Sequence, residues 1–148
     1  MPGILIIAHA PLASALKAVA THAYPECAQH IEALDVSGND TADTVEARAR
    51  AQLVRVLTPD ALVLTDVFGA TPCNAAQRLA DNPRVRILTG VNVPMLWRCL
   101  CYEHDALDAM VERAMGGATR GVMQVSGARD RTQTIEPACD AQVHHHDH

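Results

Sequence analysis

The run from Ile4 to Ile7 constrains the fold more than any other stretch, because four aliphatic residues stand in a row just before His9. A continuous apolar run is typical of a strand that is covered on both faces, as in a parallel sheet. Pro11 follows at once, and proline suits the first turn of a helix but not a central strand. The sequence therefore predicts that His9 lies in the turn between a first strand and a first helix. In open α/β sheets, ligands bind at this edge.

The chain repeats this strand–helix order as far as about residue 125. Two more aliphatic runs, one shorter and more polar run and a short final run predict four further strands, and segments with helical spacing predict helices between them. The expected strands are Ile31–Val36, Ala61–Thr65, Val85–Thr89 and Gly121–Val125; the expected helices are 11–22, 41–57, 71–80, 92–100 and 106–115, the last ended by Gly116-Gly117. This order predicts a single α/β domain with a mainly parallel central sheet flanked by helices and a short C-terminal edge strand.

Right-handed crossovers place the carboxyl ends of all parallel strands at the same edge of the sheet. His9 follows the first strand, Asp66 follows the strand at Ala61–Thr65, and the loop 90–92 follows the strand at Val85–Thr89. We therefore expect these three segments to meet, and we expect the site of the protein where they meet.

Length and composition exclude several classes of protein. With 148 residues the chain is large enough for one domain with a real core, and with 3% aromatic residues that core must be aliphatic. The low aromatic content and a net charge of −5 disfavour nucleic-acid binding. No apolar run approaches the ~18 residues of a membrane span, and the first strand is too short for a signal peptide. Five irregularly spaced cysteines suit reduced thiols, so we expect a cytoplasmic protein without membrane insertion.

The composition changes after Val125. Residues 126–148 contain few aliphatic residues and no periodicity, which predicts a disordered tail behind a domain at 1–125. The tail ends in the His-rich sequence of residues 144–148, which could bind a divalent metal loosely or have no function. We assign no specific metal site to it.

His9, Asp66 and the turn Gly69-Ala70-Thr71 match what a phosphohistidine site requires. One imidazole nitrogen must be free to attack phosphorus, while an acceptor holds the other and fixes the tautomer. A carboxylate does this and also stabilises the imidazolium that forms. Backbone N–H groups in a glycine-containing turn before a helix, here with Thr71 as the expected N-cap, bind phosphoryl oxygens. His9 and Asp66 are therefore the candidate catalytic pair, and Gly69, Ala70 and Thr71 the candidate phosphoryl-binding residues.

Each of these residues also has a simpler explanation when taken alone. A lone histidine usually has no chemical role, Asp66 could be a turn or capping residue, and Thr71 could only cap a helix. The turn lacks the GK[ST] ending of a P-loop, and no GxGxxG follows the first strand, so nucleotide binding has little support. Cys73, in the first turn of the third helix, is a minor candidate for a reactive thiol.

Three motifs, in this order, carry a resemblance to a known family. They are the aliphatic strand ending in histidine at Ile4–His9, the pattern D-x-x-G-[GA]-[ST]-P-x-N at Asp66–Asn74, and G-V-N-[IV]-P-M-L at Gly90–Leu96. With them, the chain resembles the IIA component of the mannose–fructose–sorbose family of the bacterial phosphoenolpyruvate-dependent sugar phosphotransferase system. The resemblance covers residues 1 to about 125.

Two positions depart from the family pattern. Ala10-Pro11 follows His9 where the family often has glycine, which stiffens this loop. Gly69-Ala70-Thr71 stands where Gly-Gly-Ser is common, so the hydroxyl is kept but the backbone freedom of one glycine is lost.

The resemblance implies a phosphotransferase that needs no cofactor. His9 would accept a phosphoryl group from the phosphocarrier protein HPr and pass it to a histidine of a IIB partner. Asp66 would hold the other nitrogen of His9, and the turn Gly69–Thr71 would bind the phosphoryl oxygens. The resemblance also implies a homodimer in which the last strand, Gly121–Val125, is exchanged between subunits. It leaves the sugar and the identity of the IIB partner open.

Two other functions remain open at this point. One is a regulatory binding module whose affinity for its partner depends on phosphorylation of His9, with no part in sugar transport. The other is a flavodoxin-like binder of small ligands whose histidine is inactive. The first needs the same site as a phosphocarrier, and the second predicts that His9 is never phosphorylated.

Overall fold

Strand β1 (Gly3–His9) lies inside a parallel sheet in the computed structural model, which describes residues 2–100 and 106–127. It pairs with β2 (Ile31–Val36) on one side and with β3 (Ala61–Thr65) on the other. Strand β4 (Val85–Leu88) pairs with β3 and completes the order β2-β1-β3-β4. These four strands confirm the sequence prediction to within one residue at each end.

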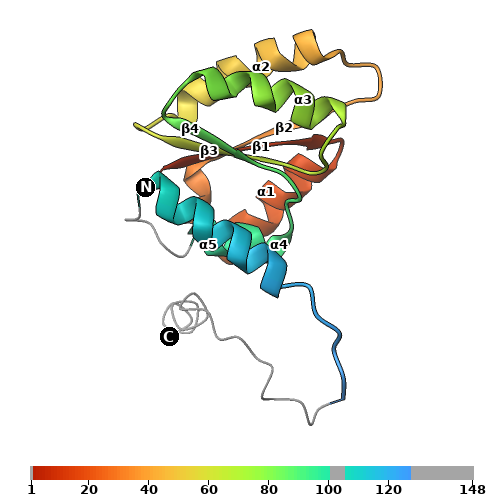
Figure 1. The fold of residues 1–148 in the computed structure, drawn as a ribbon, viewed down its shortest axis with the longest axis vertical. Coiled ribbons are helices and arrows are strands. Elements are labelled where there is room, and N and C mark those ends of the chain that lie inside the picture. The colour runs from red at the N-terminus through yellow and green to blue at the C-terminus, as the bar shows by residue number, and fades with distance from the viewer. Residues whose placement is uncertain (1, 101–105, 128–148) are drawn as a thin grey trace.

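Helices cover both faces of this sheet (Figure 1). Helices α2 (Ala42–Val56) and α3 (Thr71–Gln77) lie on one face, and α1 (Leu12–Ala23), α4 (Val93–Leu100) and α5 (Leu107–Arg120) lie on the other. Short 3₁₀ turns at Cys27–His30 and Arg78–Asp81 precede β2 and follow α3. The predicted single α/β domain with a parallel sheet is confirmed. None of the helices described combines the length and the apolar character that crossing a membrane requires.

The side chains of β1 supply both halves of the hydrophobic core. Ile4, Ile6 and Ala8 pack in the cluster under α1, α4 and α5, whereas Leu5 and Ile7 pack in the cluster under α2 and α3. All five are fully buried. Successive side chains of a strand point to opposite faces, so a strand with helices on both sides must be apolar at every position. This burial is the physical reason for the uninterrupted aliphatic run in the sequence.

Helix α5 corrects one prediction, because it continues through Gly116 and Gly117 and ends at Arg120. A Cβ atom at Gly117 would lie 2.3 Å from Cγ of Arg98 and 3.2 Å from the carbonyl oxygen of Pro94. Gly117 therefore allows α5 to pack closely against α4, and it does not end the helix. A local stop signal is here outweighed by a tertiary contact.

The structure assigns no strand to the predicted segment Gly121–Val125. Val122 and Val125 are 78% and 85% exposed, and Met123 is also exposed. A strand forms by hydrogen bonding to a neighbouring strand, and in this single chain the segment has none among the described residues. Exchange of this segment between subunits therefore stays a prediction. The predicted tail beyond residue 127 lies outside the described residues.

The close approach of β1 to the end of α2 gives a prediction about stability. A Cβ atom at Gly3 would lie 1.9 Å from the backbone carbonyl oxygen of Val56, which cannot rotate away. We expect Gly3→Ala to lower the free energy of unfolding by about 3 kcal/mol in urea denaturation. The control Gly38→Ala, with no atom within 4 Å of the new Cβ, should stay within about 0.5 kcal/mol of the unmodified protein. Equal stability of the two variants would contradict this packing.

Candidate active site

His9 and Asp66 come together at the carboxyl edge of the sheet because β1 and β3 are neighbours. Oδ2 of Asp66 accepts a hydrogen bond from the backbone N–H of His9 at 3.0 Å and lies 2.6 Å from Nδ1 of its ring. Oδ1 of Asp66 accepts from the backbone N–H of Val67 at 2.9 Å. The side chain of His9 is 51% exposed, whereas that of Asp66 is 12% exposed. A shielded carboxylate thus holds a histidine ring that is half exposed to solvent.

The charge of Asp66 decides which nitrogen of His9 is available. Burial works to raise the pKa of Asp66, but hydrogen bonds from the backbone N–H and the ring of His9 and from the N–H of Val67 outweigh it. The net pKa lies below the ordinary value for aspartate, so the carboxylate stays ionised and can only accept hydrogen bonds. Nδ1 must then carry the hydrogen, and a neutral ring has its lone pair on Nε2. The described residues provide no hydrogen-bond partner for Nε2.

The turn after Asp66 differs from the prediction in one detail. Gly69 adopts φ 91°, a left-handed conformation that favours glycine. Asn74 fixes the turn from inside α3, since its side-chain amide donates to the carbonyl of Gly69 at 3.3 Å and its N–H to that of Ala70 at 2.9 Å. The N-cap is Ala70 and not Thr71, which is the first residue of α3. The predicted cap at Thr71 is therefore wrong by one residue.

The loop 90–92 of the third motif holds the backbone of Asp66 in place. The N–H of Gly90, a residue with φ 83°, donates to the backbone carbonyl of Asp66 at 3.1 Å. The side chain of Asn92 accepts from the N–H of Met95 at 2.8 Å and donates to the carbonyl of Ala118 at 3.2 Å. The three segments predicted to meet do meet, and the loop 90–92 links the backbone of Asp66 to α4 and α5.

The chain matches a known protein family. Residues 3–115 match the family described as the PTS system fructose IIA component, where PTS denotes the phosphotransferase system. The chain belongs to this family.

The relatives of this IIA family member include the PTS system mannose-specific EIIAB component of Escherichia coli K12 and that of Shigella flexneri. Each is 30% identical to it over 112 residues, which cover 73% of this chain and 35% of the relative. The chain thus spans about a third of the length of these curated relatives.

Solved structures share the fold. The mannose/sorbose specific IIA subunit from Enterococcus faecalis matches with a TM-score of 0.78 and 20% identity, covering 86% of this chain and 97% of its own. The EIIA component from Streptococcus agalactiae gives 0.75 and 19%, covering 84% and 97%. The family resemblance predicted from the three motifs is confirmed.

The site of this IIA family member contains one residue that the sequence analysis missed. Asp35, near the end of β2, accepts hydrogen bonds from both the N–H and the hydroxyl of Ser14 in the first turn of α1. An aspartate at the end of a strand and a serine near a helix start are local signals for such a bond. The pairing itself depends on β2 lying beside β1, which periodicity does not reveal.

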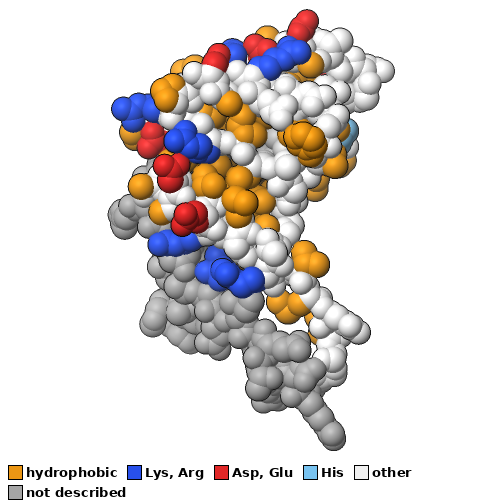
Figure 2. Space-filling model, in the orientation of Figure 1, with side chains coloured by type: hydrophobic (Ala, Val, Ile, Leu, Met, Phe, Trp, Pro, Cys, Tyr) orange, Lys and Arg blue, Asp and Glu red, His pale blue; other side chains and the backbone are white. Residues whose placement is uncertain are grey.

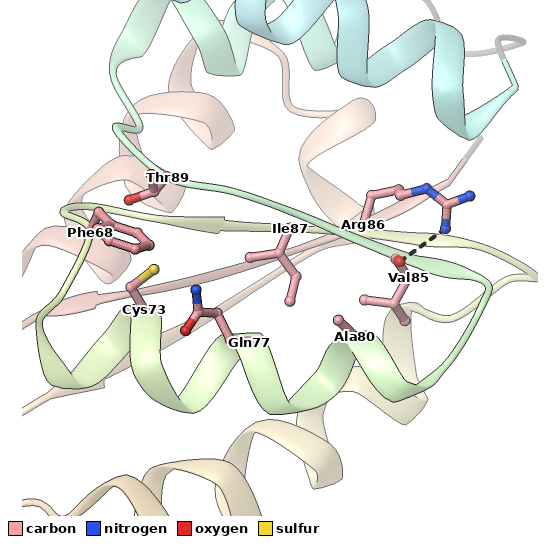
Figure 3. A pocket seen from close by; sticks show the side chains of 8 residues that line it. All are labelled: Phe68, Cys73, Gln77, Ala80, Val85, Arg86, Ile87 and Thr89. Carbon is pink, nitrogen blue, oxygen red and sulfur yellow. Dashed lines mark hydrogen bonds between the residues drawn. The ribbon is translucent and has the colours of Figure 1, made fainter.

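A groove of about 460 Å³ lies apart from His9, between α3 and β4 (Figure 3). Apolar and polar side chains line it: Phe68, Cys73, Gln77, Ala80, Val85, Arg86, Ile87 and Thr89.

Cys73 is 2% exposed, which argues against the reactive thiol considered above. In residues 2–100 and 106–127, no three His, Cys, Asp or Glu side chains are placed to hold a metal ion.

The Asp66 hydrogen bonds predict a measurable titration. The carboxyl should titrate below the ordinary aspartate pKa of about 3.9 in ¹³C NMR, and His9→Ala should raise that pKa because one of its hydrogen bonds is lost. A carboxyl whose pKa is lowered by folding stabilises the native state above the unfolded pKa, and this contribution is lost as pH falls through the folded pKa. An unchanged Asp66 titration in His9→Ala would show that the ring contact does not affect the carboxylate.

Proposed function

We propose that this chain is a phosphocarrier of the sugar phosphotransferase system that accepts a phosphoryl group on Nε2 of His9. The contact of 2.6 Å between Nδ1 and the ionised Asp66 carries the proposal, because it directs the lone pair to Nε2 of a half-exposed ring. The donor is the phosphohistidine of HPr, and the acceptor of the next step is a histidine of a IIB partner. These partners would place the reaction in the cytoplasm.

The transfer is a displacement at phosphorus. The lone pair of Nε2 attacks, a P–N bond to His9 forms, and the P–N bond to the donor histidine breaks with its electron pair staying on the donor ring. Asp66 stabilises the positive charge that develops on the His9 ring and keeps the ring in one orientation. The step needs positioning and electrostatic stabilisation more than covalent help from the protein.

The turn Gly69–Thr71 is our candidate for binding the phosphoryl oxygens. It follows Asp66 in the same loop, and Thr71 is the first residue of α3 and not its N-cap. Its hydroxyl and the backbone N–H groups of the turn would donate to the oxygens while Asp66 holds the ring. The rate of transfer would therefore depend both on Asp66 and on the turn Gly69–Thr71 that follows it.

We also infer a homodimer in which Gly121–Val125 of one subunit pairs with β4 of the other. Among the residues that the structure describes, no strand pairs with the outer edge of β4, and the segment carries exposed apolar side chains at Val122, Met123 and Val125. Figure 2 shows apolar side chains gathered in the middle of the face that β4 borders, with charged side chains beside them. An exposed edge strand is a ready site for addition of another strand.

The phosphocarrier proposal is tested by labelling with phosphoenolpyruvate, enzyme I and HPr. His9→Ala should accept no phosphoryl group, Asp66→Asn should be labelled at least about tenfold more slowly, and the control His30→Ala, at an exposed histidine, should behave like the unmodified protein. Full labelling of His9→Ala would overturn the assignment. Labelling of His9 with no transfer to any IIB protein would favour the regulatory module instead.

The dimer is tested by two truncations in sedimentation equilibrium. A chain ending at Arg120 loses the proposed pairing segment and should be monomeric, whereas a chain ending at Gly127 keeps the segment and should remain dimeric. If the two truncated chains have the same oligomeric state in solution, the proposed pairing with β4 is contradicted.

A further inference from the structure

The turn between β1 and α1 is held by a second aspartate besides Asp66. Asp35 lies opposite Ala8 in the register of β2 with β1. Its Oδ1 accepts from the N–H of Ser14 at 3.0 Å, and its Oδ2 lies 2.5 Å from the Ser14 hydroxyl oxygen. That oxygen is also 3.1 Å from the carbonyl of Pro11, and the shorter contact to the charged carboxylate is the stronger of the two.

The same turn is bound to both strands that flank β1. On the β3 side, the N–H of His9 donates to Asp66 at 3.0 Å. On the β2 side, the N–H of Ala10 donates to the carbonyl of Val36 at 2.9 Å, and Ser14 is bound by Asp35. The six residues from His9 to Ser14 thus lie between two carboxylates, that of Asp35 in β2 and that of Asp66 just after β3.

We propose that Asp35 is a positioning residue for His9. By fixing Ser14 it sets where α1 begins, and through the short turn before α1 it sets the backbone of His9, so that Nε2 keeps its direction while Asp66 holds Nδ1. The kinetic effect of this role rests on the proposed phosphocarrier function. The orientation of the His9 ring does not rest on that function, and it can be measured separately.

The exposure of His9 is the reason that such support is needed. Half of its side chain faces solvent, so packing restrains the ring little, and the hydrogen bond to Asp66 fixes only one of its atoms. A displacement of the turn would tilt the ring about that hydrogen bond and swing Nε2 away from an incoming phosphorus atom. Transfer rates depend steeply on such alignment.

The chemistry of the contact explains why an aspartate suits this position. Ser14 presents two donors, its N–H and its hydroxyl, and an ionised carboxylate accepts both at once. A negative charge is also favourable at the start of a helix, here one of 12 residues. Asparagine has one acceptor oxygen, so Asp35→Asn would keep one of the two bonds and alanine would keep neither.

The test compares Asp35→Ala and Asp35→Asn with Asp40→Ala. Asp40 lies just after β2, and its carboxylate accepts from the N–H of Ser37 and pairs with Arg48, which also donates to the backbone carbonyl of Asp35; the Asp40 carboxylate itself does not bind Ser14. In quenched-flow labelling by phosphorylated HPr, we expect Asp35→Ala to lower the limiting rate about tenfold while the half-saturating HPr concentration stays unchanged. Asp35→Asn should recover part of the rate, and Asp40→Ala should match the unmodified protein.

¹⁵N NMR of the His9 ring gives a readout that requires no phosphoryl transfer. In the unmodified protein, Nδ1 should carry the hydrogen; in Asp35→Ala, the signals should shift toward exchange between tautomers. Ser14→Ala, which removes the hydroxyl but leaves Asp35 in place, should move the signals in the same direction and replaces Asp35→Ala if that variant does not fold.

The outcomes separate the two proposals. Unchanged ring signals in both Asp35→Ala and Ser14→Ala would overturn the positioning role, as would an equal loss of rate in Asp40→Ala. An unmodified protein that accepts no phosphoryl group would overturn the phosphocarrier function, and the ring signals would still decide the role of Asp35.

Discussion

The position of β1 between β2 and β3 is the constraint on which the site depends. A strand that is buried on both faces cannot shift by a residue without moving its side chains to the wrong core cluster, so its register is strongly fixed. That register carries His9 to the sheet edge between Asp35 of β2 and Asp66 after β3. The chemistry of one exposed histidine is therefore set by a fully buried strand.

Asp66 serves two purposes with one carboxylate. Its Oδ2 contacts both the backbone N–H and the ring of His9, so the same atom locates the residue and selects its tautomer. Its own backbone carbonyl accepts from the N–H of Gly90. The cost of shielding the charge is offset by three hydrogen bonds from N–H groups, which is why the carboxyl remains ionised.

Much of this could be predicted from the sequence, because burial on both faces leaves a direct trace in aliphatic runs. The meeting of His9 and Asp66 followed from two such runs whose ends share an edge. The contact of Asp35 with Ser14 could not be predicted in this way, since it depends on which strand lies on the other side of β1. Gly116 and Gly117 misled for a related reason: the packing of α5 on α4 outweighs their local tendency to end a helix.

The His9 site and the groove beside β4 share one loop. Asp66 contacts His9, and Phe68, two residues later, lines the groove and is 72% exposed. A substitution at Phe68 would therefore change both the loop that carries Asp66 and the lining of the groove. In the proposed dimer, a change in residues 121–127 would act on association, because that segment follows α5 and is separate from the loop that carries Asp66. The proposed dimer and the proposed phosphocarrier site are therefore tested separately, by changes in residues 121–127 and by changes at His9 or Asp66.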